Sequence, residues 1–161
     1  MATKKVVDVG TKVRNFSLQD HNQQTFQLAD CKGQNVLLSF HPLAWTPVCA
    51  MQMQYLEKNN EAFKKLNTVA VGISVDSVPS KSAWAKSLKI SKIRLLADFW
   101  PHGGIAKVLG ILREEGFSER ANIIVDKNGR IAFKKIYPMV ELPDINEIIG
   151  QLELLQTADS K

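Results

Sequence analysis

Residues 36–49, VLLSFHPLAWTPVC, join a short apolar run to a cysteine at the start of a helical pattern. The apolar run, Val36 to Phe40, has the length and composition of a strand buried in a sheet. Pro42 ends this strand, and Pro47 suits the first turn of a helix because it lacks an N–H group and has a fixed φ angle. The stretch therefore predicts a buried strand that leads directly into a helix.

Cys49 lies in the first turn of that helix, with Thr46 three positions before it. A thiol is a good nucleophile only when it is ionised. The free N–H groups and the positive dipole end of a helix lower a thiol pKa from its unperturbed value of about 8.5. The position favours a reactive thiolate, so we take Cys49 as the chemical centre of the chain. The alternative is an inert, buried cysteine.

The rest of the chain alternates strand and helix patterns. Strands are expected at 16–18, 25–28, 68–75, 94–97, 122–125 and 130–137, and helices at 46–66, 79–88, 105–109 and 142–155, followed by a frayed tail. The first two strands form an N-terminal β-hairpin, and Asn128-Gly129 marks another hairpin. Because parallel strands need long crossover connections, this order predicts an α/β, thioredoxin-like fold with a central mixed β-sheet flanked by helices.

Length and composition agree with one globular unit. The chain has 161 residues, of which 45% are hydrophobic and 23% charged, enough for one full core. We expect a single domain over residues 1–161, with its core at about 10–155. No run approaches the roughly 20 apolar residues of a membrane span, and no signal-peptide pattern follows the first lysines. A soluble, cytoplasmic protein without a membrane partner is the expectation.

The two cysteines and three histidines do not suggest a metal site. Cys31 and Cys49 are too few for a disulfide scaffold or a four-ligand zinc site. His21, His41 and His102 lack the close spacing of metal ligands, so we expect no metal and no cofactor. His41 adjoins the cysteine motif and could approach the site, but we interpret it as a surface or structural histidine.

The net charge of +5 raises the question of a nucleic-acid partner. Basic residues are mixed with acidic ones over several predicted elements, and no nucleic-acid module signature is present. The densest basic stretch, Lys81 to Arg94 around Trp84, could hold a polyanion. We interpret it as a solvated helix face and expect no nucleic-acid partner.

The motif Pro42-x-x-x-Thr46-x-x-Cys49 resembles the active-site pattern of the peroxiredoxins, the AhpC/TSA superfamily. Arg120 matches the arginine that this family places at the start of a downstream strand. The similarity covers about residues 10–155 and is greatest to the AhpE-type, one-cysteine subclass. It implies a thiol peroxidase that reduces hydrogen peroxide or organic hydroperoxides through a cysteine sulfenic acid, in antioxidant defence.

The chemistry of peroxide reduction gives four residues a catalytic role in this interpretation. Cys49 attacks one peroxide oxygen, and Arg120 donates hydrogen bonds to the departing oxygen, where negative charge develops. The Thr46 hydroxyl accepts the peroxide proton and steers the reacting oxygen, while Pro42 shields the thiolate from water. Besides Cys49, the other three residues also have simpler alternatives: a helix N-cap for Thr46, a strand terminator for Pro42 and a surface ion pair for Arg120.

A second thiol must return the sulfenic acid to the thiol state. Cys31, expected in a loop, does not occupy the resolving positions of the two-cysteine subclasses. We therefore expect an external thiol or redoxin as reductant and a structural role for Cys31, with a resolving role left open. Position 52 carries glutamine where many relatives have glutamate, and Gln52 can still accept a hydrogen bond from Arg120.

The resemblance also implies a homodimer built around the loops near Trp45, Pro79 and Trp100, where exposed aromatic side chains would otherwise be a liability. Two other functions remain open. A peroxide sensor would consume peroxide stoichiometrically without turnover. A thioredoxin-fold binding protein would show an ordinary Cys49 thiol with no preference for peroxide.

Overall fold

The computed structural model describes residues 7–159 and places seven strands in one sheet. The strands are β1 (Ser17–Asp20), β2 (Thr25–Gln27), β3 (Asn35–Phe40), β4 (Thr68–Ser74), β5 (Arg94–Ala97), β6 (Arg120–Val125) and β7 (Ile131–Tyr137). The helices are α1 (Pro47–Lys58), α2 (Asn60–Lys65), α3 (Val78–Ser87), α4 (Gly104–Val108) and α5 (Ile145–Asp159), with a 3-10 helix, η1 (Leu28–Cys31).

The strand order is β2-β1-β5-β4-β3-β6-β7. β3 pairs in parallel with β4, and β4 with β5, while the other neighbours are antiparallel. The mixed sheet, the N-terminal hairpin and the thioredoxin-like fold expected from the sequence are thus confirmed. The hairpin extends the sheet, because β1 also pairs with β5.

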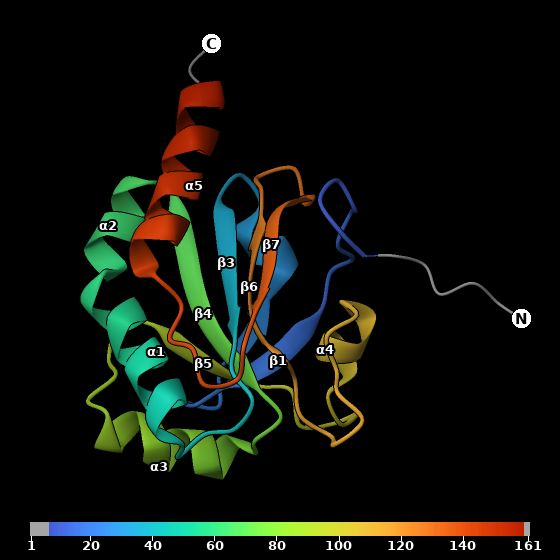
Figure 1. Ribbon diagram of the computed structural model, residues 1–161, viewed down its shortest axis with the longest axis vertical. Helices are drawn as coiled ribbons and strands as arrows, with labels where there is room; N and C mark the ends of the chain where they lie inside the picture. The colour runs from blue at the N-terminus through green and yellow to red at the C-terminus, as the bar shows by residue number, and fades with distance from the viewer. Residues whose placement is uncertain (1–6, 160–161) are drawn as a thin grey trace, which may run out of the picture.

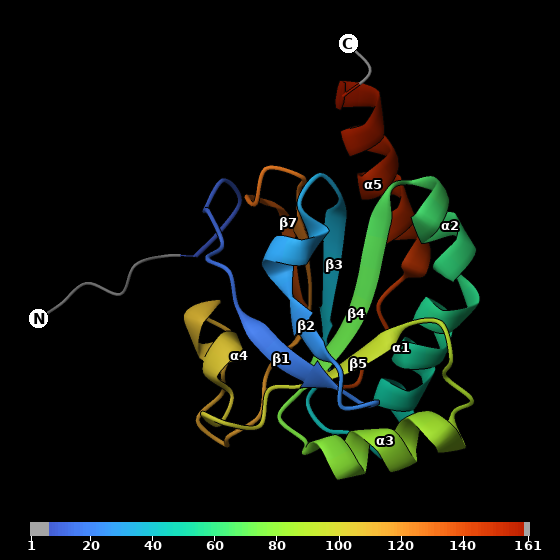
Figure 2. The same ribbon diagram turned by 180° about the vertical axis from the view of Figure 1, so that it is seen from behind.

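Helices cover both faces of the sheet (Figures 1 and 2). α1, α2, α3 and α5 pack on one face, where their apolar side chains form one core cluster. α4 and η1 pack on the other face with a second cluster. Side chains along β3 point alternately to the two faces of the sheet, so Leu37 belongs to the first cluster and Leu38 to the second.

β3 lies near the middle of the sheet, and all six of its residues are buried. It ends at the edge where the loop of residues 41–46 leads into α1. The backbone of β4 lets α1 approach closely, since a Cβ atom on Gly72 would lie 2.2 Å from Sδ of Met53. A small residue in the neighbouring strand therefore helps to position the helix that carries Cys49.

The expected helix over 46–66 is wrong in one respect, because it is divided at Asn59. The backbone of Asn59 has φ −99° and ψ 11°, and its side chain donates to the carbonyl oxygen of Tyr55 at 2.8 Å. Asparagine side chains compete with the helical backbone for hydrogen bonds, so the pair Asn59-Asn60 ends α1 although the apolar spacing continues.

Several other details differ from the expectation, mostly by one or two residues. Cys31 lies in η1 and not in a loop. β6 begins at Arg120, two residues earlier than expected, because Arg120 pairs with Tyr137 of β7. α5 begins at Ile145 and continues into the tail that we expected to be frayed, ending at Asp159. None of the helices within residues 7–159 is long and apolar enough to cross a membrane.

Candidate active site

The loop between β3 and α1 is held by the segment that begins α3. The backbone N–H of Ala44 donates to Oδ2 of Asp76 at 2.8 Å, and Nε1 of Trp45 donates to Oγ of Ser80 at 3.0 Å. Trp45 adopts a left-handed backbone conformation, with φ 73°, which is unfavourable for a bulky residue. These contacts fix a strained loop, and with it the start of α1.

Thr46 occupies the N-cap position of α1, with φ −98° and ψ 148°, and Pro47 follows it. Its hydroxyl does not cap the helix but donates to the carbonyl oxygen of Leu43 at 2.9 Å. The hydroxyl proton is thus engaged, and the oxygen lone pairs remain available as acceptors. Cys49 follows in the first turn of α1 and is fully buried.

Arg120 lies against Cys49 although 71 residues separate them in the sequence. β6 runs antiparallel to β3, so the first residue of β6 lies at the edge where β3 ends. Nη1 of Arg120 is 3.3 Å from Sγ of Cys49, and its Nε and Nη2 donate to the carbonyl oxygen of Met139 at 3.1 and 2.8 Å. Only 3% of Arg120 is exposed, so the alternative of a surface ion pair does not apply.

Gln52 holds the same guanidinium from α1. Its Oε1 accepts a hydrogen bond from Nη1 of Arg120 at 2.7 Å. Its Nε2 donates to Oγ of Ser39 at 2.7 Å and to the carbonyl oxygen of Phe40 at 3.2 Å. The Ser39 hydroxyl donates onward to Oδ1 of Asn122 at 2.8 Å. A neutral amide therefore orients Arg120. No sequence signal had indicated that Ser39 and Asn122 support this amide.

A cavity of about 270 Å³ opens beside these groups. Its lining consists of Pro42, Leu43, Thr46, Pro47, Val48, Phe117, Arg120 and Met139. Cys49 is not part of the lining, but Arg120, which contacts its sulfur, and Thr46 are. The structure thus brings all four predicted site residues together: three line the cavity, and the fourth contacts Arg120.

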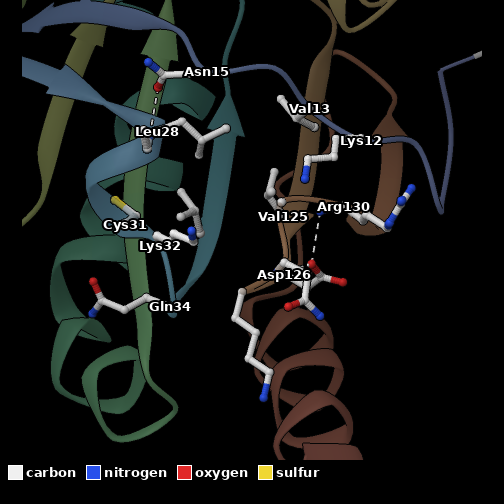
Figure 3. A pocket seen from close by; sticks show the side chains of 15 residues that line it. Lys12, Val13, Asn15, Leu28, Cys31, Lys32, Gln34, Val125, Asp126 and Arg130 are labelled. Atoms are coloured by element: carbon white, nitrogen blue, oxygen red, sulfur yellow. Dashed lines mark hydrogen bonds between the residues drawn. The ribbon is translucent and has the colours of Figure 1, made fainter.

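A larger pocket, of about 560 Å³, contains Cys31 and lies elsewhere (Figure 3). Cys31 precedes β3 and Cys49 follows it, so the length of a six-residue strand, about 20 Å, separates them. A disulfide needs Cα atoms within about 7 Å. Burial and the negative charge of Asp30 raise the pKa of the Cys31 thiol. This thiol is therefore poorly placed to react with Cys49 of the same chain.

A buried basic pair, His41 and Lys81, was not expected from the sequence. Both side chains are fully buried, and Nζ of Lys81 lies 2.7 Å from Nε2 of His41. The interpretation of residues 81–94 as a solvated face is thus wrong for Lys81. Its position three and four residues before Trp84 and Ala85, which are also buried, places it on the inner stripe of α3. That spacing was the available signal.

Burial lowers the pKa of Lys81 to about 7, while the nearby charges of Asp76 and Cys49 act in the opposite direction. Burial and the positive charges of Lys81 and Arg120 hold the pKa of His41 well below its usual range. His41 is therefore neutral. Within residues 7–159, no group of three or more histidine, cysteine or acidic side chains is arranged to hold a metal ion.

Known proteins resemble the chain over most of its length. The sequence pattern of the AhpC/TSA family matches residues 9–134. Alkyl hydroperoxide reductase E of Mycobacterium tuberculosis is 34% identical over 141 residues, covering 86% of this chain and 92% of that protein. Peroxiredoxin 2 of Sulfurisphaera tokodaii is 37% identical over 135 residues, covering 80% of this chain and 63% of that protein.

The fold leads to the same family. Reduced 2-Cys peroxiredoxin of Plasmodium vivax superimposes with a TM-score of 0.87 at 26% identity, over 94% of this chain and 83% of that chain. AhpC of Mycobacterium tuberculosis, at 20% identity, shares the fold with a TM-score of 0.85. The family match, the relatives and the fold agree, and the chain belongs to the AhpC/TSA family as a peroxiredoxin, a thiol-dependent peroxidase.

Proposed function

We propose that this peroxidase reduces hydrogen peroxide and organic hydroperoxides at Cys49, and that Thr46, Arg120 and Pro42 complete its catalytic site. The observation that carries the proposal is the 3.3 Å contact between Nη1 of Arg120 and Sγ of Cys49 beside a cavity. A fixed positive charge at this distance favours the thiolate over the thiol.

The reaction follows from these positions. The thiolate of Cys49 attacks one peroxide oxygen, so that an S–O bond forms as the O–O bond breaks. Negative charge develops on the departing oxygen, toward which Arg120 donates. The Thr46 hydroxyl already donates to a backbone carbonyl, so its oxygen is oriented to accept the hydrogen of the incoming hydroperoxide. The products are an alcohol, or water, and a cysteine sulfenic acid.

The lining of the cavity supports organic hydroperoxides as substrates. Besides the buried Pro42, it contains the apolar side chains of Leu43, Val48, Phe117 and Met139. These side chains exclude water from the sulfur and can contact an alkyl group. The relative from Mycobacterium tuberculosis is named for the reduction of alkyl hydroperoxides.

We further propose a one-cysteine mechanism with an external reductant, a low-molecular-weight thiol or a redoxin. Cys31 lies at the far end of β3 from Cys49 and so supports no internal disulfide. The external thiol attacks the sulfenic sulfur, water leaves, and a second thiol reduces the mixed disulfide. Turnover that is unchanged in Cys31→Ser is expected, and its loss would contradict this mechanism.

The proposal includes a homodimer of single-domain chains, residues 1–161, that acts in the cytoplasm in antioxidant defence. Large apolar side chains are exposed near the active-site loop: 54% of Trp45, 52% of Phe99 and 82% of Trp100. Burying them against a second copy removes an unfavourable apolar surface. Sedimentation at micromolar concentration should show the mass of a dimer. The mass of a monomer would contradict the proposed homodimer.

Stopped-flow tryptophan fluorescence tests the catalytic roles, because Trp45 adjoins the site. The reduced protein is mixed with hydrogen peroxide or an organic hydroperoxide, and the oxidation rate is compared with that of three variants. Cys49→Ser should abolish the change, and Thr46→Val should slow it strongly. Thr46→Ser keeps the hydroxyl and should retain most of the rate. Wild-type rates in Thr46→Val would exclude the proposed role of the hydroxyl.

A further inference from the structure

The mechanism above leaves one buried cation near the reactive sulfur without a function. Lys81 of α3 is fully buried, and its Nζ lies 2.7 Å from Nε2 of His41. Among residues 7–159, no ion pair joins this ammonium group to a carboxylate. A buried charge without a counter-charge is strongly unfavourable.

His41 does not supply the missing counter-charge. It is a neutral imidazole whose Nε2 accepts from the ammonium group, and its buried Nδ1 has no hydrogen-bond partner within the described residues. Its ring also packs on Trp84, with ring centroids 5.2 Å apart, so the pair is enclosed by apolar surface. When Lys81 is protonated, a balancing negative charge has to come from another neighbour.

The register of α1 on β3 brings Cys49 to the side of this basic pair. Gln52 contacts Ser39, which lies on the same face of β3 as the side chain of His41, two residues later. Cys49 precedes Gln52 by almost one helical turn, in the direction of His41. The thiol thus lies on the side of the basic pair that faces α1.

Charged and titratable groups face this pair from every element around it. They are His41 after β3, Cys49 in α1, Asp76 after β4, His21 after β1 and, acting on His41, Arg120 of β6. Only Cys49 and Asp76 can carry a negative charge. Asp76, whose Oδ2 also accepts from the backbone of Ala44 and the hydroxyl of Ser74, acts more strongly on Lys81 than Cys49 does.

We propose that Lys81 is a second cation of the thiol site, whose ammonium group, held on neutral His41, favours the thiolate form of Cys49. The thiolate in turn adds a second negative charge near the buried ammonium group, besides that of Asp76. Lys81 does not touch the peroxide and is a positioning residue that acts through the sulfur. When oxidation converts the thiolate into a neutral sulfenic acid, Lys81 loses this counter-charge and its proton affinity falls.

The inference rests on the proposed role of Cys49, but its test measures ionisation and not turnover. The alkylation rate of Cys49 by iodoacetamide is followed against pH in a Cys31→Ser background. Lys81→Met should raise the midpoint of this profile by about one pH unit, because an opposite charge is removed. Lys81→Arg keeps the charge and should stay near the parent, and so should Lys86→Met, which removes an exposed lysine from the same helix.

An unchanged midpoint in folded Lys81→Met would overturn the inference, even if Cys49→Ser still abolishes peroxide reduction and the proposed function stands. A second measurement leaves Lys81 in place. The titration of its ammonium group is followed by NMR before and after Cys49 is alkylated to a neutral thioether. Alkylation should lower the midpoint of Lys81, since the coupling is reciprocal. A midpoint that does not move would also overturn the inference, whether or not Lys81→Met folds.

Discussion

Gln52 orients Arg120 through one well-defined end of its amide. Oε1 of Gln52 accepts from Nη1 of Arg120 at 2.7 Å, while its Nε2 donates to β3 at Ser39 and Phe40. Reversing the amide would place N–H groups against the guanidinium and leave the β3 acceptors without a donor. The direction of the guanidinium is therefore set jointly by α1, β3 and β6, without a carboxylate.

Ser39→Ala should destabilise the protein more than the loss of a single hydroxyl oxygen suggests. The change leaves Nε2 of Gln52 with one partner fewer and removes the donor to Oδ1 of Asn122, both in a buried site. The loss of hydrogen bonds to buried groups costs about 1–3 kcal/mol of the free energy of unfolding. Urea unfolding measures it. Ser82→Ala, at an exposed position of α3, should change stability by less than about 0.5 kcal/mol.

Arg120→Met should slow the reaction of Cys49 with peroxide by about 100-fold to 1000-fold, because a fixed donor to the developing charge is removed. Stopped-flow oxidation of the reduced protein measures the rate. Arg120→Lys should recover only part of it, since one ammonium group cannot contact Cys49, Gln52 and Met139 together. Arg130→Met removes a charge from an exposed residue and is the matched control. A wild-type rate in Arg120→Met would show that this arginine does not assist the reaction of Cys49 with peroxide.

The pKa of Lys81 predicts how stability depends on pH. In the folded protein this pKa is lowered to about 7, whereas a lysine in the unfolded chain has a pKa of about 10.4. Between these values the unfolded chain binds a proton that the folded protein does not. The free energy of unfolding should therefore rise with pH over this window, by up to about 1.4 kcal/mol per pH unit. This contribution is lost as the pH falls to about 7.

Lys81→Met should lack this part of the slope, and Lys86→Met should keep it. Urea unfolding at several pH values between about 7 and 10 measures the difference. Equal slopes in the wild type and Lys81→Met would mean that Lys81 has a similar pKa in the folded and unfolded states, contrary to its burial.

Local signals predicted much of the fold and three of the four proposed site residues. The apolar run of β3, followed by Pro42 and Pro47, predicted the strand, the loop and the start of α1. The same few residues contain Thr46 and Cys49, so their proximity follows from local structure alone. The end of α1 at Asn59 was missed, because a competing side-chain hydrogen bond leaves the apolar spacing unchanged.

Pairing between distant strands was harder to predict. Arg120 reaches Cys49 only because β6 pairs with β3, and its place in the site was inferred from a family resemblance and not from spacing. Lys81 was misinterpreted because lysine is usually exposed. Its inward position depends on how α3 packs, and its partner His41 is 40 residues away in the sequence. Ser39 and Asn122 looked like ordinary polar strand residues until the register of β3 and β6 brought them opposite each other.

Gly72→Ala should destabilise the protein, although alanine is normally more stable than glycine inside a strand. The new Cβ atom would lie 2.2 Å from Sδ of Met53 and 3.0 Å from Cδ2 of Leu95, so α1 or its side chains must move. Overpacking of this kind costs about 1–3 kcal/mol, and thermal or urea unfolding measures it. Because Met53 lies one turn beyond Cys49 on α1, peroxide reduction should slow as well.

Gly150→Ala is the control with the opposite sign: its Cβ atom meets nothing within 4 Å, so it should stabilise α5 by about 0.5–1 kcal/mol. In Gly72→Ala combined with Met53→Ala the two costs should be less than additive, and strict additivity would contradict the close contact.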